Sequence, residues 1–289
     1  MHTTLIDVPA LQQLIAGGQT LAVFDCSFDL FDPDLGRRHF EETHLPGARH
    51  AHLDHLLSEK SPDQPRSSGG RHPLPSREVF ARRMRDLGLN QDTQVVVYDR
   101  QGANYSGRLW WMLRWCGHPA AAVLDGGLQA WQAAGCPVES GPGPGPAQVA
   151  GNFQSSAAPG APVMNATELR RSLGSPDLTI IDARAPARYR GETEPLDPVA
   201  GHIPGAFNRP FGDNLGPDGR FKSPEALRRE FAALLGQRHP AGVVHHCGSG
   251  VSAIPNVLAM AVAGWGLTAL FPGSWSEWCE TPGAVFARG

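Results

Sequence analysis

The chain lacks any long apolar run. No stretch of its 289 residues approaches the apolar length of a membrane span, and residues 1–4 show neither region of a signal peptide. It also lacks a block of basic residues, and its formal net charge is -3 at pH 7. These absences argue against nucleic acid and membrane as the main partners, and we expect a cytoplasmic protein.

Cysteine is scarce and not clustered. The five cysteines include no Cys-x-x-Cys motif, which argues against a disulfide framework and against a structural zinc site. The 12 histidines follow no metal-ligand spacing, so we expect neither a metal nor a cofactor. The glycine pairs at 69–70 and 126–127 have no lysine at phosphate-loop spacing, which disfavours that class of nucleotide site.

What the chain does have is an internal repeat. A hydrophobic content of 41% and a charged content of 18% fit a globular protein with an ample core. Six landmarks recur in the same order in the two halves, so the chain is a tandem duplication. The landmarks are residues 21–25, 44–48, 76–80, 88, 95–99 and 124–131, and then 178–182, 202–206, 223–227, 236, 243–247 and 271–278.

Each half alternates short β-branched strands with amphipathic helices. This alternation is typical of an α/β domain with a mostly parallel sheet flanked by helices. The intervening residues 139–162 are rich in Gly, Pro, Ser and Ala and predict an extended linker that buries little. We therefore predict an N-terminal domain at 1–140, a linker at 141–162 and a C-terminal domain at 163–289.

The segment 243–252 runs from a short apolar strand into Cys247 and then into a glycine-bearing loop that opens a helix. Ser252 can cap this helix, and Pro255 fits its first turn. Cys247 then lies at a strand's carboxyl end, facing backbone N–H groups that stabilise an anion or a charged sulfur adduct. Cys247 is interpreted as a nucleophile. The alternative is a buried structural cysteine.

The repeat supplies an internal comparison, because Asp99 occupies the position that Cys247 has in the second half. A core site that requires an apolar residue would not accept aspartate. The position is therefore predicted to be an exposed loop start, which favours a chemical role for Cys247. It also predicts that the N-terminal domain is catalytically silent.

The chain resembles the tandem-domain rhodanese family of sulfurtransferases. The segments that carry the resemblance are 44–48, 182–184, 202–206 and 273–278. The loop 247–252 is similar to the signature of the branch that uses 3-mercaptopyruvate, with Ser252 where threonine is usual. The resemblance implies two tandem rhodanese-like domains. It also implies transfer of sulfur from 3-mercaptopyruvate through a Cys247 persulfide to cyanide or a thiol, such as thioredoxin or a small dithiol.

The resemblance also implies site residues. A relay of serine, histidine and aspartate would supply a proton to the departing enolate, and backbone N–H groups and arginine would hold the persulfide and the donor carboxylate. The catalytic residues implied are Cys247, Ser249, His72 and Asp54. The donor-binding residues implied are Arg184, Arg188, Gly248, Gly250, Val251 and Ser252. For Arg184, which follows the strand-end Asp182, the alternative is that it ties loops together through hydrogen bonds.

The sequence departs from this branch at one place. Enzymes of this kind often carry a second arginine after a Glu-Pro pair, but here 194–195 is followed by Leu196 and Asp197. Arg190 or Arg108 would have to compensate.

Three other functions are weighed against this one. Thiosulfate:cyanide sulfurtransferase activity is disfavoured because those relatives more often carry basic residues inside the loop. A sulfur carrier would load sulfur once and stop. A dual-specificity phosphatase needs an arginine closing the loop, whereas Ala253 and Ile254 follow Ser252 here.

Overall fold

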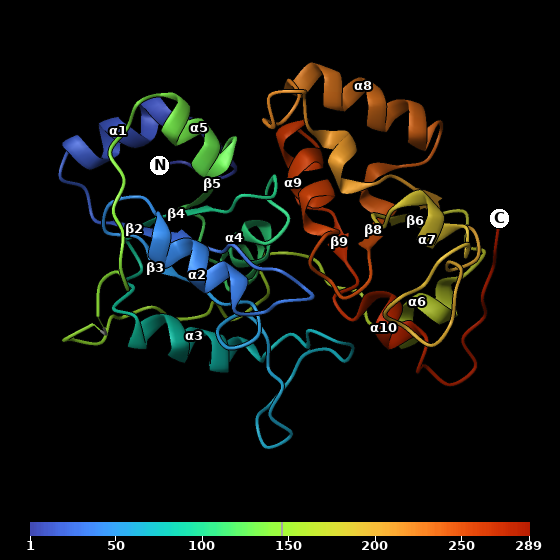
Figure 1. Cartoon of the computed structure of the whole chain (residues 1–289). Coiled ribbons are helices and arrows are strands. Elements are labelled where there is room, and N and C mark those ends of the chain that lie inside the picture. Colours follow the sequence, from blue (N-terminus) through green and yellow to red (C-terminus); the bar gives the residue numbers. More distant parts are fainter. Residues whose placement is uncertain (146) are drawn as a thin grey trace. The chain divides into compact units, whose positions relative to one another are not determined.

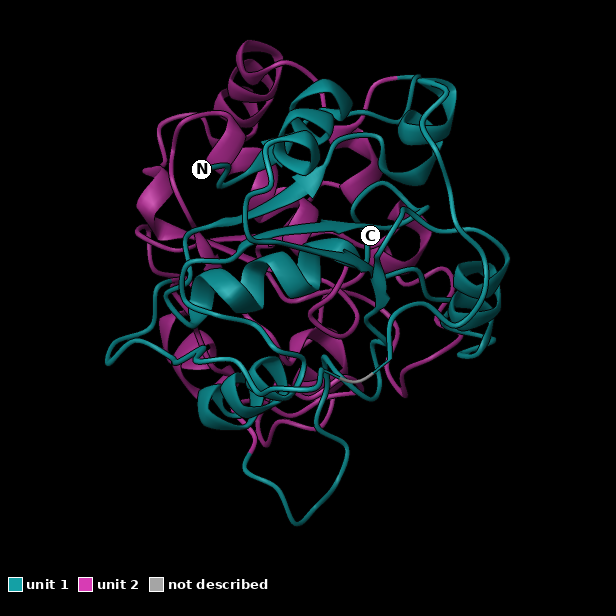
Figure 2. Cartoon of the chain, turned by 90° about the vertical axis from the view of Figure 1, so that its left-hand side faces the viewer, with its two compact units in different colours: residues 1–65, 75–160, 217–220 teal, residues 66–74, 161–216, 221–289 magenta. Residues whose placement is uncertain are grey.

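A computed structural model describes residues 1–145 and 147–289 of the chain. Its contacts divide these residues into two compact units (Figures 1 and 2). The first unit comprises Met1–Pro65, Pro75–Gly160 and Pro217–Arg220, and the second comprises Arg66–Leu74, Ala161–Gly216 and Phe221–Gly289. The segment Arg66–Leu74 thus belongs to the second unit, although it comes from the first half of the sequence.

The first unit is built on a parallel sheet with strand order β1-β5-β4-β2-β3. One sheet face, with Val96 and Tyr98, packs against Leu11, Phe40 and Trp131 of three helices. The strands are β1 (Leu5–Ile6), β2 (Leu21–Asp25), β3 (Arg49–His50), β4 (Gln94–Tyr98) and β5 (Ala121–Leu124). The helices are α1 (Val8–Ala16), α2 (Leu35–Glu42), α3 (Arg77–Asp86), α4 (Ser106–Trp115) and α5 (Gly127–Ala133).

The second unit is built on a parallel sheet with strand order β7-β6-β8-β9. The strands are β6 (Thr179–Asp182), β7 (Phe207–Asn208), β8 (Val243–His246) and β9 (Ala269–Leu270). The helices are α6 (Ala166–Ser172), α7 (Pro186–Tyr189), α8 (Pro224–Leu235), α9 (Ile254–Val262) and α10 (Ser274–Trp278), with short 3-10 turns at Phe211–Asn214 and Pro240–Gly242.

Helices cover both faces of this second sheet. Val244 packs in one core cluster with residues of α6 and α10. The neighbouring Val243 packs in another cluster with residues of α8 and α9. Because successive strand residues point to opposite faces, β8 is buried on both sides, as is typical of a central strand in a parallel sheet. The predicted fold class is confirmed.

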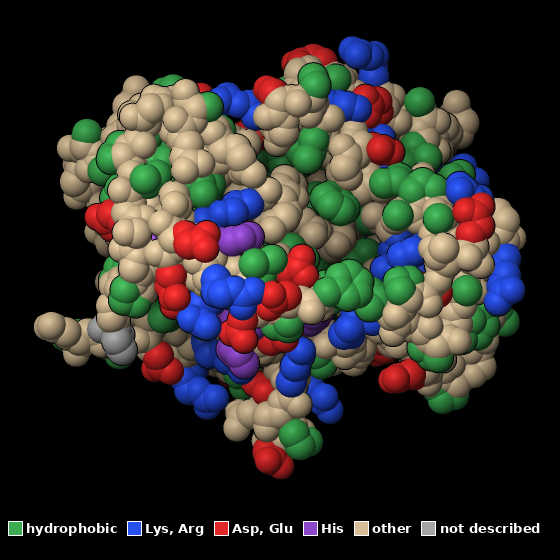
Figure 3. Space-filling model, viewed as in Figure 1, with side chains coloured by type: hydrophobic (Ala, Val, Ile, Leu, Met, Phe, Trp, Pro, Cys, Tyr) green, Lys and Arg blue, Asp and Glu red, His purple; other side chains and the backbone are tan. Residues whose placement is uncertain are grey.

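No helix in the described part of the chain is long and apolar enough to cross a membrane. On the face drawn in Figure 3, Lys and Arg side chains lie among Asp and Glu side chains rather than forming a surface of one sign.

Helix starts test the sequence interpretation directly. Ser76 caps α3 by accepting a hydrogen bond from the Val79 N–H, and Ser223 caps α8 in the same way, both as the repeat predicts. The predicted cap at Ser252 is wrong, because α9 begins after Ala253 without a side-chain cap. The Ile254 N–H donates instead to the Val251 carbonyl at 3.0 Å, so the loop closes through its own backbone.

The segment between the two repeats does not bury as little as predicted. Phe153 is fully buried, with its ring centroid 6.3 Å from that of Phe80. Its N–H donates to the Leu89 carbonyl at 3.1 Å, and the Gly151 N–H donates to the Arg85 carbonyl at 2.8 Å. Phe153 and several hydrogen bonds therefore tie this glycine- and proline-rich segment to the first unit. Pro146, which the linker prediction includes, lies outside the described residues.

The loop after β4 corrects the prediction that Asp99 is exposed. Asp99 is buried, with 1% of its surface accessible. Its carboxylate accepts four backbone N–H groups at 2.8 to 3.0 Å, two on each oxygen, from Gln101, Ala103, Tyr105 and Ser106. The loop is thus a ring of donors around an anion, and the anion is the loop's own side chain.

We expect the Asp99→Asn substitution to lower the free energy of unfolding by about 2–4 kcal/mol, because the amide nitrogen cannot accept two of these four charge-assisted bonds. Denaturant unfolding measures the change. The control is Asp92→Asn, an exposed aspartate before the start of β4, where we expect a change below about 0.5 kcal/mol. Equal effects of the two substitutions would contradict the role given to the Asp99 carboxylate.

Candidate active site

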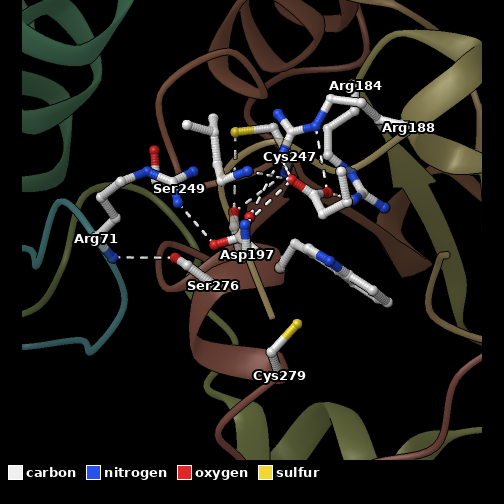
Figure 4. A network of polar contacts seen from close by, with 12 residues as sticks. Arg71, Arg184, Arg188, Asp197, Cys247, Ser249, Ser276 and Cys279 are labelled. Atoms are coloured by element: carbon white, nitrogen blue, oxygen red, sulfur yellow. Dashed lines mark hydrogen bonds and ion pairs between the residues drawn. The ribbon is translucent and has the colours of Figure 1, made fainter. Parts of the chain in front are cut away.

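Cys247 is the first residue after β8, the strand between β6 and β9 in the sheet of the second unit. It lies at the carboxyl end of the strand, where parallel sheets place their chemistry, and only 2% of its surface is accessible. Its backbone is held by the start of α10. The Cys247 N–H donates to Ser274 Oγ at 3.1 Å, and its carbonyl accepts from the Trp275 N–H at 3.0 Å. Ser274 Oγ itself lies 4.0 Å from Cys247 Sγ (Figure 4).

Gly250 gives the loop after Cys247 its curvature. Its φ of 74° lies in the left-handed region, and a Cβ there would meet the Pro272 carbonyl oxygen at 1.9 Å. Within the described residues, the backbone N–H groups of Ser249 and Val251 donate to no other residue. In the repeat register these two correspond to Gln101 and Ala103, whose N–H groups bind the Asp99 carboxylate. The second loop therefore offers donors at the positions that the first loop fills with its own anion.

Other cysteines are poorly suited to attack a donor. Burial raises the pKa of Cys116 to about 12 and that of Cys279 to about 11. Burial, with the nearby Asp25 and Asp99, also raises the pKa of Cys26. These three side chains are therefore thiols rather than thiolates near neutral pH, and the thiolate is the nucleophilic form.

Arg188, on α7, lies beside the loop, and its role in binding the donor stays a prediction. A Cβ on Gly248 would lie 3.4 Å from Arg188 Nη1, so this guanidinium lies beside the residue that follows the cysteine. Arg188 Nη2 also lies 2.6 Å from Glu194 Oε1 and 3.2 Å from Asp197 Oδ2. These two carboxylates hold the guanidinium in place.

Arg184 lies deeper. Its side chain is 2% exposed, and its Nη2 donates to Asp182 Oδ2 at 2.6 Å and to the Gly201 carbonyl at 2.7 Å. Its Nη1 reaches Glu194 Oε2 at 3.2 Å, and its guanidinium lies over the Trp275 ring. Arg184 therefore supports the carboxylate that holds Arg188.

Sequence reasoning missed Arg71. It belongs to the segment Arg66–Leu74 of the second unit, and its Nη2 would lie 3.2 Å from a Cβ on Gly248. Its N–H donates to Ser276 Oγ of α10 at 3.0 Å, and its Nη1 lies 2.7 Å from Asp197 Oδ1. Figure 4 shows Arg71 and Arg188 on either side of Asp197. The only sequence signal for Arg71 is its position next to His72.

The two arginines named as substitutes have other partners. Arg190 forms an exposed pair with Glu192, with Nε 2.6 Å from Oε1. Arg108 is buried in α4 of the first unit, where its Nη2 lies 3.4 Å from the Leu57 carbonyl. Arg71 is therefore the second arginine that the structure places at Gly248.

One of the two links of the predicted relay lies within the second unit. His72 Nδ1 lies 2.7 Å from Ser249 Oγ, and both residues are buried. Asp54 belongs to the first unit, where its Oδ1 lies 2.7 Å from Lys60 Nζ. The link between Asp54 and His72 stays a prediction. Ser252, the last predicted loop residue, is half-buried at the turn before α9.

His246 is the last residue of β8, directly before Cys247, and it was also missed as a site residue. Burial lowers its pKa despite the nearby Asp182 carboxylate, so the ring is neutral. Its Nδ1 lies 3.2 Å from the Cys247 carbonyl oxygen, and its Nε2 lies 3.6 Å from Asp182 Oδ2. Burial alone would raise the pKa of Asp182, but the Arg184 guanidinium beside it lowers that pKa, so this carboxylate is ionised.

Comparison with known proteins identifies the family to which the chain belongs. A model of the rhodanese-like domain matches residues 7–134 and again residues 165–281. A protein of Pseudomonas aeruginosa named "Probable 3-mercaptopyruvate sulfurtransferase" is 45% identical over 273 residues, covering 93% of each chain. The thiosulfate sulfurtransferase of Mus musculus is 33% identical over 288 residues, covering 96% of this chain and 92% of its own.

A solved structure agrees with these relatives. The crystal structure of SseA from Escherichia coli, described under the fold and catalytic mechanism of 3-mercaptopyruvate sulfotransferases, superposes with a TM-score of 0.79. It is 30% identical, and the match covers 96% of this chain and all of that one (100%). Two rhodanese-like domains in one chain, with relatives of this similarity, show that the protein belongs to the rhodanese family and is a sulfurtransferase.

Proposed function

We propose that this sulfurtransferase takes its sulfur from 3-mercaptopyruvate and passes it through a persulfide on Cys247 to an acceptor thiol, such as thioredoxin or a small dithiol, or to cyanide. The observation that carries the proposal is the placement of two guanidiniums, of Arg71 and Arg188, at Gly248. Arginine binds a carboxylate through paired N–H groups, and this donor carries its carboxylate close to the sulfur that is transferred. The 45% identical relative supports the same donor.

The first half-reaction forms the persulfide. The Cys247 thiolate attacks the sulfur of 3-mercaptopyruvate, the carbon–sulfur bond breaks, and its electron pair stays on carbon as pyruvate enolate. The enolate takes a proton from the pair of His72 and Ser249 and leaves as pyruvate. The persulfide anion accepts hydrogen bonds from the free N–H groups of Ser249 and Val251, which need no reorganisation.

The second half-reaction unloads the enzyme. An acceptor thiolate attacks the outer sulfur, the sulfur–sulfur bond breaks, and Cys247 leaves as a thiolate. The acceptor then carries the sulfur as its own persulfide, or as thiocyanate when cyanide is the acceptor. Two such steps predict ping-pong kinetics.

The proposal is tested by steady-state kinetics with 3-mercaptopyruvate and thiosulfate in parallel, using cyanide and dithiothreitol as acceptors. A higher kcat/KM for 3-mercaptopyruvate would support it. A higher kcat/KM for thiosulfate would replace it with the thiosulfate:cyanide activity, which the same two arginines also permit. One sulfur loaded per chain without turnover would identify a carrier.

Substituting His72 tests the proton supply. We expect His72→Gln to lower kcat with 3-mercaptopyruvate by ~100-fold, because the enolate loses its proton source. The rate with thiosulfate should fall by less than ~3-fold, since its leaving group is sulfite, which needs no proton on carbon. The control is His239→Gln on the exposed surface of the second unit, which should leave both rates unchanged. Equal losses with both donors would assign His72 a structural role instead.

A further inference from the structure

Asp197 is placed where a donor carboxylate would bind. Its Oδ1 lies 2.7 Å from Arg71 Nη1 and its Oδ2 lies 3.2 Å from Arg188 Nη2, so one carboxylate bridges both guanidiniums (Figure 4). The Asp197 side chain is 3% exposed. The same two guanidiniums meet at Gly248, next to the nucleophile. An aspartate of the chain itself thus binds the guanidiniums of Arg71 and Arg188, which we call the arginine pair. In the sequence, this aspartate follows the Glu-Pro pair at 194–195, after which the expected arginine is missing.

Glu194, the neighbouring carboxylate, is bound in a different way. It accepts the N–H groups of Leu196 and Asp197 at 3.1 and 3.3 Å, so it is part of the turn that it stabilises. It also bridges Arg184 and Arg188. In the described part of the chain, the Asp197 carboxylate accepts from Arg71 and Arg188 only. A donor carboxylate can therefore replace Asp197 on the arginines without breaking a turn.

The charges around the arginine pair balance. The guanidiniums of Arg71, Arg184 and Arg188 interact with the carboxylates of three acidic residues, namely Asp182, Glu194 and Asp197. The formal charge of this cluster is zero. Within this cluster the Asp197 carboxylate offsets part of the attraction that the arginines exert on an incoming anion, and its own repulsion is about twice as large for a dianion as for a monoanion.

We propose that Asp197 is a specificity-determining residue, which occupies the arginine pair in the empty enzyme and makes the donor site selective for sulfur donors with one negative charge. 3-Mercaptopyruvate carries one carboxylate, whereas thiosulfate is a dianion. This inference rests on the proposed function, since it concerns the choice between the two donors at the same arginines.

The experiment compares kcat/KM for 3-mercaptopyruvate and thiosulfate in the wild-type enzyme and in Asp197→Asn. The amide keeps the shape of the side chain and removes its charge. We expect the preference for 3-mercaptopyruvate over thiosulfate to fall by about tenfold or more, equivalent to ~1.4 kcal/mol, mainly through a lower KM for thiosulfate. Asp197→Glu, which retains the charge, should stay within about threefold of the wild-type preference.

Glu192→Gln is the matched control. It removes the carboxylate from the exposed ion pair between Arg190 and Glu192, and it should leave the preference between the two donors unchanged. An unchanged preference in Asp197→Asn would overturn the proposal. A rise in KM for both donors by the same factor would also overturn it, because Asp197 would then only position the arginines. Asp197→Ala gives the same comparison if the amide variant does not fold.

The role proposed for Asp197 can fail separately from the proposed function of the enzyme. If the wild-type enzyme transfers sulfur from neither donor, the proposed function is wrong, and Asp197 is tested by binding alone. Calorimetry on Cys247→Ser, with and without Asp197→Asn, would use pyruvate as the monoanion and inorganic sulfate as the dianion. We expect the Asp197→Asn substitution to strengthen sulfate binding more than pyruvate binding, and equal changes would overturn the inference.

Discussion

A Cys247→Ser variant is expected to fold normally and to lose sulfur transfer with every donor, with turnover at least ~10³-fold lower. Serine keeps the size of the side chain, but its oxygen cannot form the persulfide through which the transfer is proposed to run. Steady-state kinetics measures the loss. Mass spectrometry after addition of donor should show one added sulfur atom per wild-type chain and none on the variant.

The fold is expected to survive because two contacts of Cys247 with α10 run through its backbone, to Ser274 and Trp275, and a serine oxygen can also face Ser274 Oγ, which lies 4.0 Å from Sγ. The free energy of unfolding should change by less than about 1 kcal/mol. Cys279→Ser is the control, because this half-buried thiol packs near the Val199 carbonyl and carries no part of the loop. Turnover retained in Cys247→Ser, or lost in Cys279→Ser, would move the nucleophile away from Cys247.

The second large effect is expected from Gly250→Ala, which should lower kcat/KM by ~100-fold or more and destabilise the second unit by about 3 kcal/mol. Two costs add here. A left-handed φ of 74° costs a residue with a side chain about 1 kcal/mol, and the new Cβ would lie 1.9 Å from the backbone oxygen of Pro272. Because the Pro272 oxygen and the new Cβ are both fixed by backbone, the loop has to move away from Pro272, which displaces the N–H groups of Ser249 and Val251.

Gly266 separates these two costs. It has the same φ of 74°, and nothing lies within 4 Å of a Cβ built on it. Gly266→Ala should therefore show the conformational cost of about 1 kcal/mol and normal kinetics. Chemical unfolding and steady-state kinetics on both variants give the comparison. If the two substitutions had the same effect, the contact with Pro272 would not be what shapes the loop.

The sequence predicts the larger features of the site because they follow from local patterns. A strand, a cysteine and a glycine-bearing loop place Cys247 at the end of β8, and the repeat aligns it with Asp99. The serine caps of α3 and α8 are also local, since each bond spans three residues. Such contacts depend on residues close in the chain, which is why spacing alone finds them.

The features that sequence reasoning missed depend on contacts between distant segments. Arg71 is 126 residues away from its partner Asp197, and no periodicity links the two. The approach of the Arg71 segment to α10 requires Gly70, where a Cβ would lie 2.5 Å from the Gly273 carbonyl oxygen. The sequence shows that an arginine is missing after Glu194, but the side chain that takes its place is set by tertiary packing.

Asp99 shows why an exposed position was predicted where a buried one exists. Aspartate is rarely buried without partners, and the partners in this case are backbone N–H groups, which every sequence contains. Only the curvature of the loop turns those groups inward. The same reason explains Ser252, whose capping role is taken over by a backbone bond within the loop.

The carboxylate of Asp99 has a consequence for how the two repeats differ. An enzyme must release what it binds, and a ligand that is covalently part of the chain cannot dissociate. Asp99 thus occupies the loop as a covalently attached ligand, at a local concentration that no free anion reaches. We expect the first repeat to lack turnover for two reasons that meet in one residue: position 99 carries no sulfur, and its carboxylate fills the loop that would otherwise receive an anion.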